Sequence, residues 1–295
     1  MKHFSIVKKA KVFFSISLIF LLVGVVSMLT RGFNLGIDFT GGSIIDVKFE
    51  NPVTVSEVRD VLSDHKLGSS IIQLGSMDGQ QTEESQSVLI RTGIISDDQR
   101  VETMTDMTNR LGPNEVLRVE NVGATVGRDL VKSAMGAVAL SWVLMIIYIT
   151  IRFEHTFAFA AIIALIIDVM VTLSWFSLLQ LEMDSSFVAA LLTVVGYSIN
   201  GTIVIFDRIR ENLHTHRRSE SLGDMVDNSI WQTMNRSIYT SATTLFAVIA
   251  IFLFGGETIR NFSFAMLVGF SSGFYTSTFL AGPLWIKLRS RGTHK

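Results

Sequence analysis

The chain has 295 residues, 48% of them hydrophobic, with a mean hydropathy of +0.44 and a formal net charge of −1. Its apolar residues are gathered into long blocks, which indicates an integral membrane protein and excludes a soluble globular chain. Cysteine is absent, which excludes disulfides, iron–sulfur clusters and thiolate metal sites.

Six apolar segments are long enough to cross a membrane, because a helical crossing takes about 20 residues. The predicted order is a cytosolic N-terminus (1–11), span 12–30, an extracytoplasmic domain (31–132), spans 133–151, 156–179 and 186–206, a cytosolic amphipathic connection (207–236), spans 237–254 and 262–286, and a cytosolic tail (287–295). The fold class is therefore an α-helical integral membrane protein with six transmembrane helices and an inserted domain.

The orientation follows from the lysines and arginines beside the spans, which favour the cytoplasmic side. One side collects Lys2, Lys8, Lys9, Lys11, Arg152, Arg208, Arg210, Arg217, Arg218, Lys287, Arg289 and Arg291. The short loops on the other side, 180–185 and 255–261, contain one positively charged residue, Arg260. Both termini are therefore expected in the cytosol.

The first span has a second interpretation, because Lys8, Lys9 and Lys11 before an apolar run also describe a secretory signal peptide with cleavage after Ser27. The run is long for a signal peptide and no clear Ala-x-Ala follows it. A retained anchor is favoured, since five spans would place the two termini on opposite sides.

The large loop between the first two spans holds ten Lys/Arg and sixteen Asp/Glu, which argues against nucleic acid as a partner. Strands are predicted at 43–49, 69–74, 87–92 and 115–122, and helices begin at the capping signatures Thr54 to Glu57 and Ser96 to Gln99. This β-α-β-β-α-β order predicts an α+β ferredoxin-like domain. It is a common binding scaffold whose fold specifies no activity, and we find no catalytic constellation in it.

No enzymatic, cofactor or metal site is predicted. Gly36, Gly41 and Gly42 are expected to shape a turn. No glycine cluster carries the lysine of a phosphate-binding loop, so none is expected to bind phosphate. His214 and His216 are two residues apart, which is typical of solvated loop histidines. The spacings Gly123 to Gly127 and Gly269 to Gly273 favour close helix packing.

Polar side chains inside the spans are the strongest functional candidates, because hydrocarbon offers them no hydrogen-bond partner. Tyr197, Ser198 and Asn200 should face protein or a wet cavity. Asp168 lies in the middle of its span and is either a proton carrier or a neutral group that packs helices.

Arg236 precedes a hydroxyl-rich start of the span 237–254, and its position alone indicates an arginine that snorkels to the interface. Asp207 and Arg208 are expected to anchor the cytosolic end of the preceding span. The segment 208–221 is a basic cytosolic stretch. The apolar residues Leu222, Met225, Val226 and Ile230 then recur at helical spacing, which predicts an amphipathic helix along the inner interface, bound to lipid or docked on a partner protein.

Four motifs resemble the SecD/SecF family within the RND superfamily, and the resemblance covers essentially the whole chain. They are Gly36-Ile-Asp38-Phe39-Thr-Gly41-Gly42, Val122-Gly123-Ala-Thr-Val-Gly127-Arg-Asp-Leu130, Gly196-Tyr197-Ser-Ile-Asn200 and Asp207-Arg208-Ile-Arg210-Glu211-Asn212. The resemblance implies half of an RND-type bundle, in which a SecF-type chain pairs with SecD.

The resemblance further implies a prokaryotic plasma membrane, cooperation with the SecYEG channel and SecA, contact with an exported unfolded polypeptide, and use of a proton or sodium gradient. Arg236 matches an arginine that family members use in ion transport. Many members have Asn-Asp where this chain has Asn200-Gly201, so the essential carboxylate is expected in SecD. Two alternatives stay open, a structural subunit that stabilises SecD and a homodimeric RND exporter.

Overall fold

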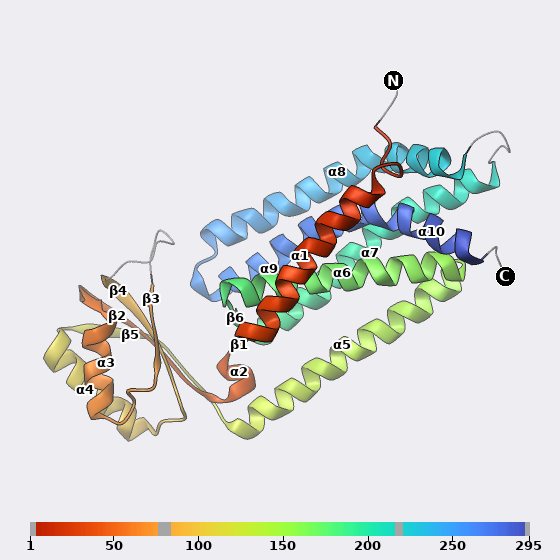
Figure 1. Cartoon of the computed structure of the whole chain (residues 1–295). Coiled ribbons are helices and arrows are strands. Elements are labelled where there is room, and N and C mark those ends of the chain that lie inside the picture. Colours follow the sequence, from red (N-terminus) through yellow and green to blue (C-terminus); the bar gives the residue numbers. More distant parts are fainter. Residues whose placement is uncertain (1–3, 76–83, 216–220, 293–295) are drawn as a thin grey trace. The chain divides into compact units, whose positions relative to one another are not determined.

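The computed structural model describes residues 4–75, 84–215 and 221–292. Contacts divide the chain into two compact units, one made of residues 1–34 and 135–295 and the other of residues 35–134. The first is a helical bundle and the second is an α+β domain (Figure 1).

Six helical segments of the described residues are long and apolar enough to span a membrane. The bundle contains α1 (Ala10–Arg31), most of α5 (Ala124–Arg152), α6 (His155–Leu179), β6 (Glu182–Met183), α7 (Ser185–His214), α8 (Leu222–Phe254), the 3₁₀ turn η1 (Glu257–Ile259), α9 (Arg260–Tyr275), the π-helical turn η2 (Thr276–Ala281) and α10 (Gly282–Gly292). The predicted six-helix fold class is confirmed.

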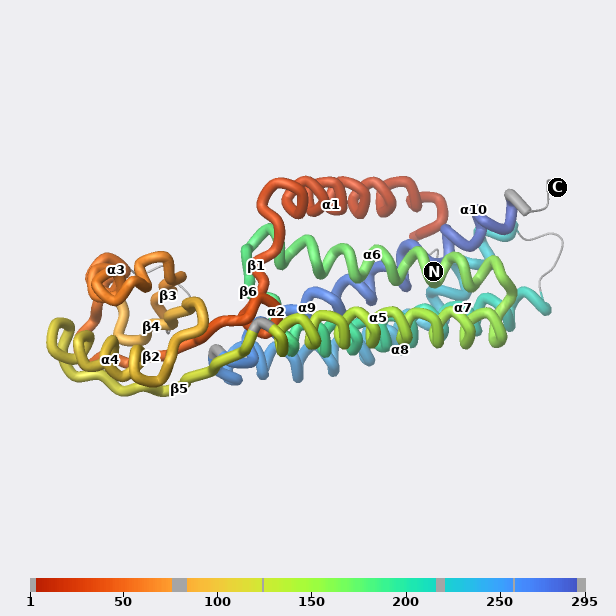
Figure 2. The backbone as a smooth tube through the Cα atoms, turned by 90° about the horizontal axis from the view of Figure 1, so that it is seen from below, coloured from red at the N-terminus to blue at the C-terminus, as the bar shows by residue number. Residues whose placement is uncertain are grey.

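Two elements differ from the expected organisation. The amphipathic segment after α7 is not a separate helix, because residues 222–236 form the first turns of α8. The last span is not one regular helix, because η2 separates α9 from α10. Figure 2 shows α9 and α10 following one another along the bundle.

The bundle core lies between α6, α7, α8, α10 and the chain before α1. Its aromatic centre stacks Phe157 on Trp285, with ring centroids 4.6 Å apart, and sets Phe206 edge-on to Phe157. Gly269 of α9 meets Val194 of α7 so closely that a Cβ atom at position 269 would lie 2.2 Å from Cγ2 of Val194. Few residues of α5 and of the membrane part of α8 are instead buried.

The α+β domain comprises β1 (Asn34–Leu35) at its boundary, α2 (Ile37–Thr40), β2 (Gly42–Thr54), α3 (Val55–Asp64), β3 (Ile71–Gly75), β4 (Glu84–Thr92), α4 (Asp97–Leu111) and β5 (Asn114–Val122). The antiparallel sheet has the order β3-β4-β2-β5, and α3 and α4 cover one face (Figure 1). This is the predicted ferredoxin-like arrangement.

Alternating apolar residues build the domain core, because successive strand residues point to opposite faces. Val47 and Phe49 of β2 and Ile90 of β4 are fully buried against α3 and α4. Both helices begin where the sequence predicts. Thr54 Oγ1 accepts from the Glu57 N–H at 3.2 Å while Glu57 accepts from the Thr54 N–H at 2.8 Å, which completes a capping box.

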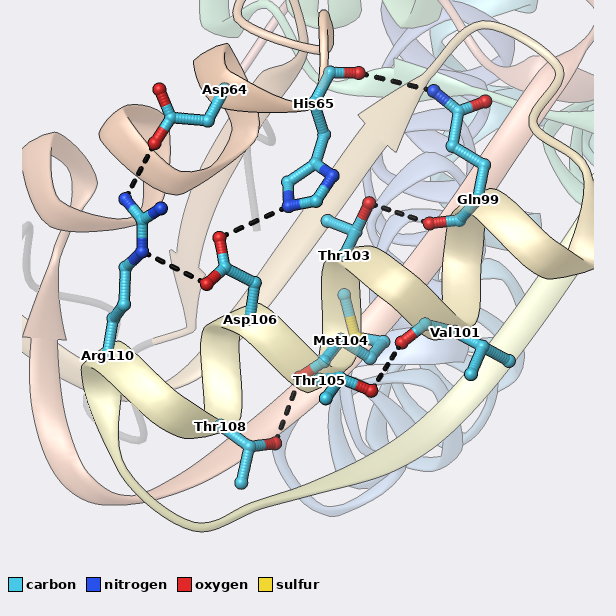
Figure 3. Close-up of polar contacts among 10 residues, drawn as sticks. All are labelled: Asp64, His65, Gln99, Val101, Thr103, Met104, Thr105, Asp106, Thr108 and Arg110. Carbon is cyan, nitrogen blue, oxygen red and sulfur yellow. Dashed lines mark hydrogen bonds and ion pairs between the residues drawn. The ribbon is translucent and has the colours of Figure 1, made fainter.

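A polar network joins α3 to α4 on the side away from the sheet (Figure 3). His65 Nε2 lies 3.2 Å from Oδ2 of Asp106, whose Oδ1 accepts from Arg110 Nε at 3.0 Å. Arg110 Nη1 also donates to Asp64 at 2.6 Å. The hydrogen bond to Asp64 and the charge of Asp106 raise the pKa of Arg110 above its usual value. The two helices are therefore held together by charge as well as by apolar packing.

Candidate functional site

Asp168 lies in α6 with its side chain fully buried in the bundle. Within the described residues its carboxylate accepts hydrogen bonds from three hydroxyls. Ser272 of α9 donates to Oδ1 at 2.6 Å, Thr276 of η2 lies 2.9 Å from each oxygen, and Ser198 of α7 donates to Oδ2. Three elements of the bundle thus converge on one carboxylate, and we call these four residues the Asp168 cage.

Helical spacing explains this convergence. Ser272 and Thr276 are four residues apart, which places both hydroxyls on the same face of the last span. Gly273 lies between them, where a Cβ atom would come within 3.0 Å of Ser198 Cβ, so α9 can approach α7 closely. Ser198 was predicted to face protein rather than lipid, and it does.

The cage can hold a proton. An ionised carboxylate accepts all three hydroxyl hydrogens, whereas a protonated one carries a hydrogen of its own and needs one fewer donor. Among the described residues no cation pairs with Asp168. The three hydroxyls therefore stabilise the ionised carboxylate of Asp168, and binding of a proton must rearrange their hydrogen bonds.

A second polar site lies beside the Asp168 cage. Tyr197, Asn200 and Gly201 of α7 line a cavity of about 60 Å³ together with Arg236 of α8 and Ser277 of η2. The Tyr197 hydroxyl lies 3.2 Å from Ser241 Oγ on α8. Both Asn200 and Arg236 are exposed at the surface of the bundle. We call this group the Arg236 pocket.

The structure thus separates the sequence-predicted residues into two neighbouring sites. Asp168 belongs to the cage, whereas Tyr197, Asn200 and Arg236 belong to the pocket. Gly201 also lies at the pocket, where a Cβ atom would come 3.2 Å from Ser277 Oγ. An acid at position 201 would therefore point at Ser277 and share the pocket with Arg236.

The motif at the end of α7 forms ion pairs and hydrogen bonds with α5 and α8. Asp207 Oδ1 lies 3.5 Å from Arg152 and 3.2 Å from Arg210, and Arg208 donates to Gln232 at 2.6 Å. Two further contacts complete this end, from Arg208 to Glu211 at 2.5 Å and from Asn212 to Ser229 at 2.8 Å. His214 lines the same charged cleft, and His216 lies outside the described residues together with Arg217 and Arg218.

The glycine motif before β2 shapes a turn around α2. Gly41 and Gly42 have positive φ angles of 73° and 142°, and a Cβ atom on Gly42 would come within 2.6 Å of the Thr92 carbonyl oxygen. Gly36 precedes α2, which contains Asp38 and Phe39. A Cβ atom on Gly127 would lie 3.2 Å from the carbonyl oxygens of these two residues. Gly127 therefore packs against α2 rather than another span, whereas a Cβ atom on Gly123 or Gly196 would meet open space.

Sequence reasoning missed Ser272, Thr276 and Ser277. The available signals were two hydroxyl residues four apart in an apolar span and the pair Gly282-Pro283 just beyond them. Proline lacks an N–H and clashes with the carbonyl four residues earlier, so it favours an irregular turn before it.

Comparison with known proteins agrees with this architecture. Residues 102–291 match the family described as protein export membrane protein SecD/SecF, C-terminal, and residues 26–53 match the SecD/SecF GG motif. The chain is 78% identical to protein translocase subunit SecF of Acidaminococcus fermentans over 99% of both chains, and 42% identical to SecF of Sebaldella termitidis over 96% of this chain and 91% of that one.

The bundle and domain also resemble a solved structure. The crystal structure of SecDF from Thermus thermophilus superposes with a TM-score of 0.88 at 32% identity, and the match covers 98% of this chain but 39% of the solved chain. A SecDF structure in a super-membrane-facing form gives a TM-score of 0.72 at 32% identity. The chain therefore belongs to the SecD/SecF family of protein-export membrane proteins, as a member of its SecF branch.

Proposed function

We propose that this multi-pass SecF subunit, which assists protein translocation in a complex with SecD, helps couple export to an ion gradient through Asp168. The observation that carries the proposal is the Asp168 cage, in which a fully buried carboxylate accepts hydroxyl hydrogens from α7, α9 and η2. Buried ionisable groups in membrane helices are expensive and mark ion pathways.

Binding of a proton by Asp168 changes how three helical elements are bonded. The carboxylate becomes a carboxylic acid that donates one hydrogen bond, so at least one hydroxyl of the cage has to find another acceptor. Release of the proton restores the original hydrogen bonds of the cage. A gradient that loads Asp168 from one side and unloads it to the other would therefore alternate the packing of α6 against α7 and the last span.

The exposed polar face of α7 and α8 is the proposed contact with SecD. Arg236 and Asn200 lie exposed on helices that span hydrocarbon, where a guanidinium needs a partner. Gly201 supplies no charge at this place, so we propose that SecD supplies the carboxylate. The exposure of the membrane part of α8 supports a helix of SecD packing there.

The remaining assignments rest on charge and on the family. We place the chain in the cytoplasmic membrane of a prokaryote with both termini in the cytosol, because lysine and arginine collect at one end of the spans. The α+β domain would then lie outside the cytoplasm. The exported unfolded polypeptide would emerge there from SecYEG, after SecA has driven the early stage of translocation.

One observation favours the alternative in which this subunit stabilises SecD without carrying ions. The extensive bonding of Asp207, Arg208 and Asn212 at the end of α7 is structural, and Gly201 lacks an ionisable group. In that case Asp168 would serve helix packing alone, and its replacement by asparagine would leave export unchanged.

The deciding experiment is translocation of a model secretory protein into inverted vesicles that contain this chain and its SecD, with and without a proton gradient. Asp168→Asn and Arg236→Ala are compared with wild type at equal complex abundance. Ser271→Ala and Arg260→Ala are matched controls, since Ser271 is exposed beside the cage residue Ser272 and Arg260 lies at the far end of the last span.

We expect both test variants to assemble and to lose the gradient-dependent stimulation, whereas both controls keep it. If Asp168→Asn assembles and keeps full stimulation, the coupling role of Asp168 is wrong and the structural alternative holds.

A further inference from the structure

The last span contains a π-helical turn, η2, where the sequence predicts regular helix. A π turn accommodates one residue more than an α turn and weakens the local hydrogen bonding, so it is rare and frequently marks a functional site. In a membrane it persists only where side chains satisfy the backbone groups that it frees. Its first two residues, Thr276 and Ser277, both carry hydroxyls that lie near backbone carbonyls of the preceding turn.

The Thr276 hydroxyl has two competing acceptors. Its Oγ1 lies 2.9 Å from each carboxylate oxygen of Asp168 and 3.3 Å from the carbonyl oxygen of Gly273. A hydroxyl has one hydrogen to donate, so a strong bond to Asp168 is made at the expense of the bond to Gly273. The charge of Asp168 favours the former, because hydrogen bonds to an ionised acceptor are about twice as strong as neutral ones.

The next residue, Ser277, belongs to the Arg236 pocket. Its Oγ would lie 3.2 Å from a Cβ atom at position 201, and it donates to the Phe274 carbonyl at 3.2 Å. Adjacent residues of one turn therefore touch the two polar sites. A change in the hydrogen-bond register of η2 cannot move Thr276 without moving Ser277.

The end of η2 also bears on α8. Gly282 follows η2 directly, and a Cβ atom on it would lie 3.0 Å from Val226 Cγ1 and 3.2 Å from Ile230 Cδ1. Both contacts belong to the buried first turns of α8, the helix that carries Arg236. Any rotation of the chain at Gly282 is thus opposed by α8 or transmitted to it.

We infer that η2 is the mechanical link between the Asp168 cage and the Arg236 pocket, with Thr276 as its positioning residue. When Asp168 binds a proton, Thr276 transfers its hydrogen bond to Gly273, the register of η2 changes, and Ser277 and α10 shift relative to α7 and α8. When Asp168 releases the proton to solvent, the cage reforms and the shift reverses. This link rests on the proposed coupling role of Asp168.

Asp168 is the group whose protonation is proposed to change the hydrogen bonds of the cage, because no other charged group contacts it among the described residues. The elements packed against α6 are α1, α7, α9, η2 and α10. Their described charged or titratable side chains are Lys11, Arg31, Tyr197, Asp207, Arg208, Arg210, Glu211, His214, Arg260, Tyr275, Lys287 and Arg289. Among the described contacts, none of these forms an ion pair or hydrogen bond with Asp168.

The test measures the distance between α8 and α10 in the intact complex. The chain has no cysteine, so spin labels on cysteines introduced at the exposed positions Asn235 and Lys287 are unique when SecD is used without cysteines. The labelled complex in lipid nanodiscs is compared in acidic and alkaline buffer. We expect the wild-type distance to shift by roughly 1–2 Å or more, the scale of helix shifts in switching proteins.

Two substitutions separate a linking role from a merely structural one. Thr276→Val keeps the shape but removes the hydroxyl, and we expect the pH-dependent shift to be lost. Thr276→Ser restores the hydroxyl, and the shift should return. Thr243→Val is the matched control, because the Thr243 hydroxyl bonds, among the described contacts, to carbonyls of its own helix, and it should shift like wild type.

The outcomes also distinguish this link from the proposed function. A wild-type shift in Thr276→Val, or its loss in both Thr276 variants, would overturn the link. If Asp168→Asn abolishes gradient-stimulated translocation while the wild-type distance is the same at both pH values, Asp168 keeps its coupling role and η2 is not the transmitting element. If Asp168→Asn changes neither translocation nor the distance shift, both proposals are wrong.

Discussion

The backbone N–H of Ile6 donates to the buried carboxylate of Asp227 at 3.0 Å, which joins the start of the chain to the first turns of α8. The N–H of Val7 donates to the same oxygen at 2.9 Å, Ser5 Oγ bonds to the other, and Trp231 Nε1 donates to the Phe4 carbonyl at 2.9 Å. Ile6 itself is fully buried in the aromatic core. These contacts hold the residues just before α1 against α8, the helix that carries Arg236.

The first prediction concerns this anchor. Asp227→Ala leaves two backbone N–H groups without their acceptor, which should lower the free energy of unfolding by about 1–3 kcal/mol. Thermal unfolding in detergent and proteolysis of the N-terminus should both report the loss. Asp224→Ala is the control, because Asp224 is half exposed and lies 3.9 Å from Lys8, and its effect should be within about 1 kcal/mol. Equal effects of the two variants would contradict an anchoring role.

The second prediction concerns helix packing. Gly269→Ala places a Cβ atom 2.2 Å from Val194, so α9 and α7 must separate, at a cost of about 1–3 kcal/mol in unfolding free energy. Adding Val194→Ala should recover most of this loss, and a double-mutant cycle of thermal unfolding measures the recovery. Gly136→Ala on α5 is the control, since its Cβ atom meets open space and alanine favours helix. Additive losses would exclude the proposed clash.

The third prediction concerns the capping box of α3. The backbone N–H and hydroxyl of Thr54 hold the pKa of Glu57 below its usual value. A lowered folded-state pKa gives stability that is present above the unfolded-state pKa and lost as the pH falls through the folded-state value. The protection factors of the α3 amides, which compare each exchange rate with its intrinsic rate at the same pH, should therefore fall in acid, and Glu57→Ala should remove this dependence. Thr54→Ala should cost about 1 kcal/mol at neutral pH. Protection factors that are independent of pH in the wild type would contradict this account.

The fourth prediction concerns Asp46 on the sheet face opposite α3 and α4. Burial raises its pKa, and the neighbouring Arg118 partly opposes this. A raised folded-state pKa means that folding penalises the ionised form, so the penalty is full above the folded-state pKa and fades as the pH falls through it. Asp46→Asn should stabilise the domain at neutral pH, with a gain that shrinks in acid, as measured by thermal unfolding. Glu102→Gln on the exposed face of α4 should show no such gain, and a loss of stability in Asp46→Asn would disprove the assignment.

Much of the architecture could be predicted because it depends on local patterns. The alternation in β2 and the caps at Thr54 and Ser96 are local, and they gave the order of the α+β domain and the starts of both helices. The lengths of the apolar runs likewise gave six spans. The continuity of α8 was missed, because residues 222–236 have an amphipathic pattern. Such a pattern is the same for a separate helix and for the buried beginning of a longer helix.

The two polar sites could be predicted only in part. Asp168, Tyr197, Asn200 and Arg236 stand out singly as polar residues in apolar spans. Their separation into a cage and a pocket depends on how α7 and the last span are rotated about their axes, which is a tertiary property. Serine and threonine are common in membrane helices, so the spacing of Ser272 and Thr276 was a weak signal until the fold placed them around a carboxylate.

Asn200 and Arg236 lie exposed on α7 and α8, so a copy of this chain made in excess of its partner leaves this amide and this guanidinium without the groups that we propose SecD supplies. Such a copy is less stable in the bilayer than an assembled one, by the free energy of leaving those groups without partners. Membrane quality-control proteases act on unstable chains. The cellular amount of this subunit is therefore expected to follow the supply of SecD, with unassembled copies removed by degradation.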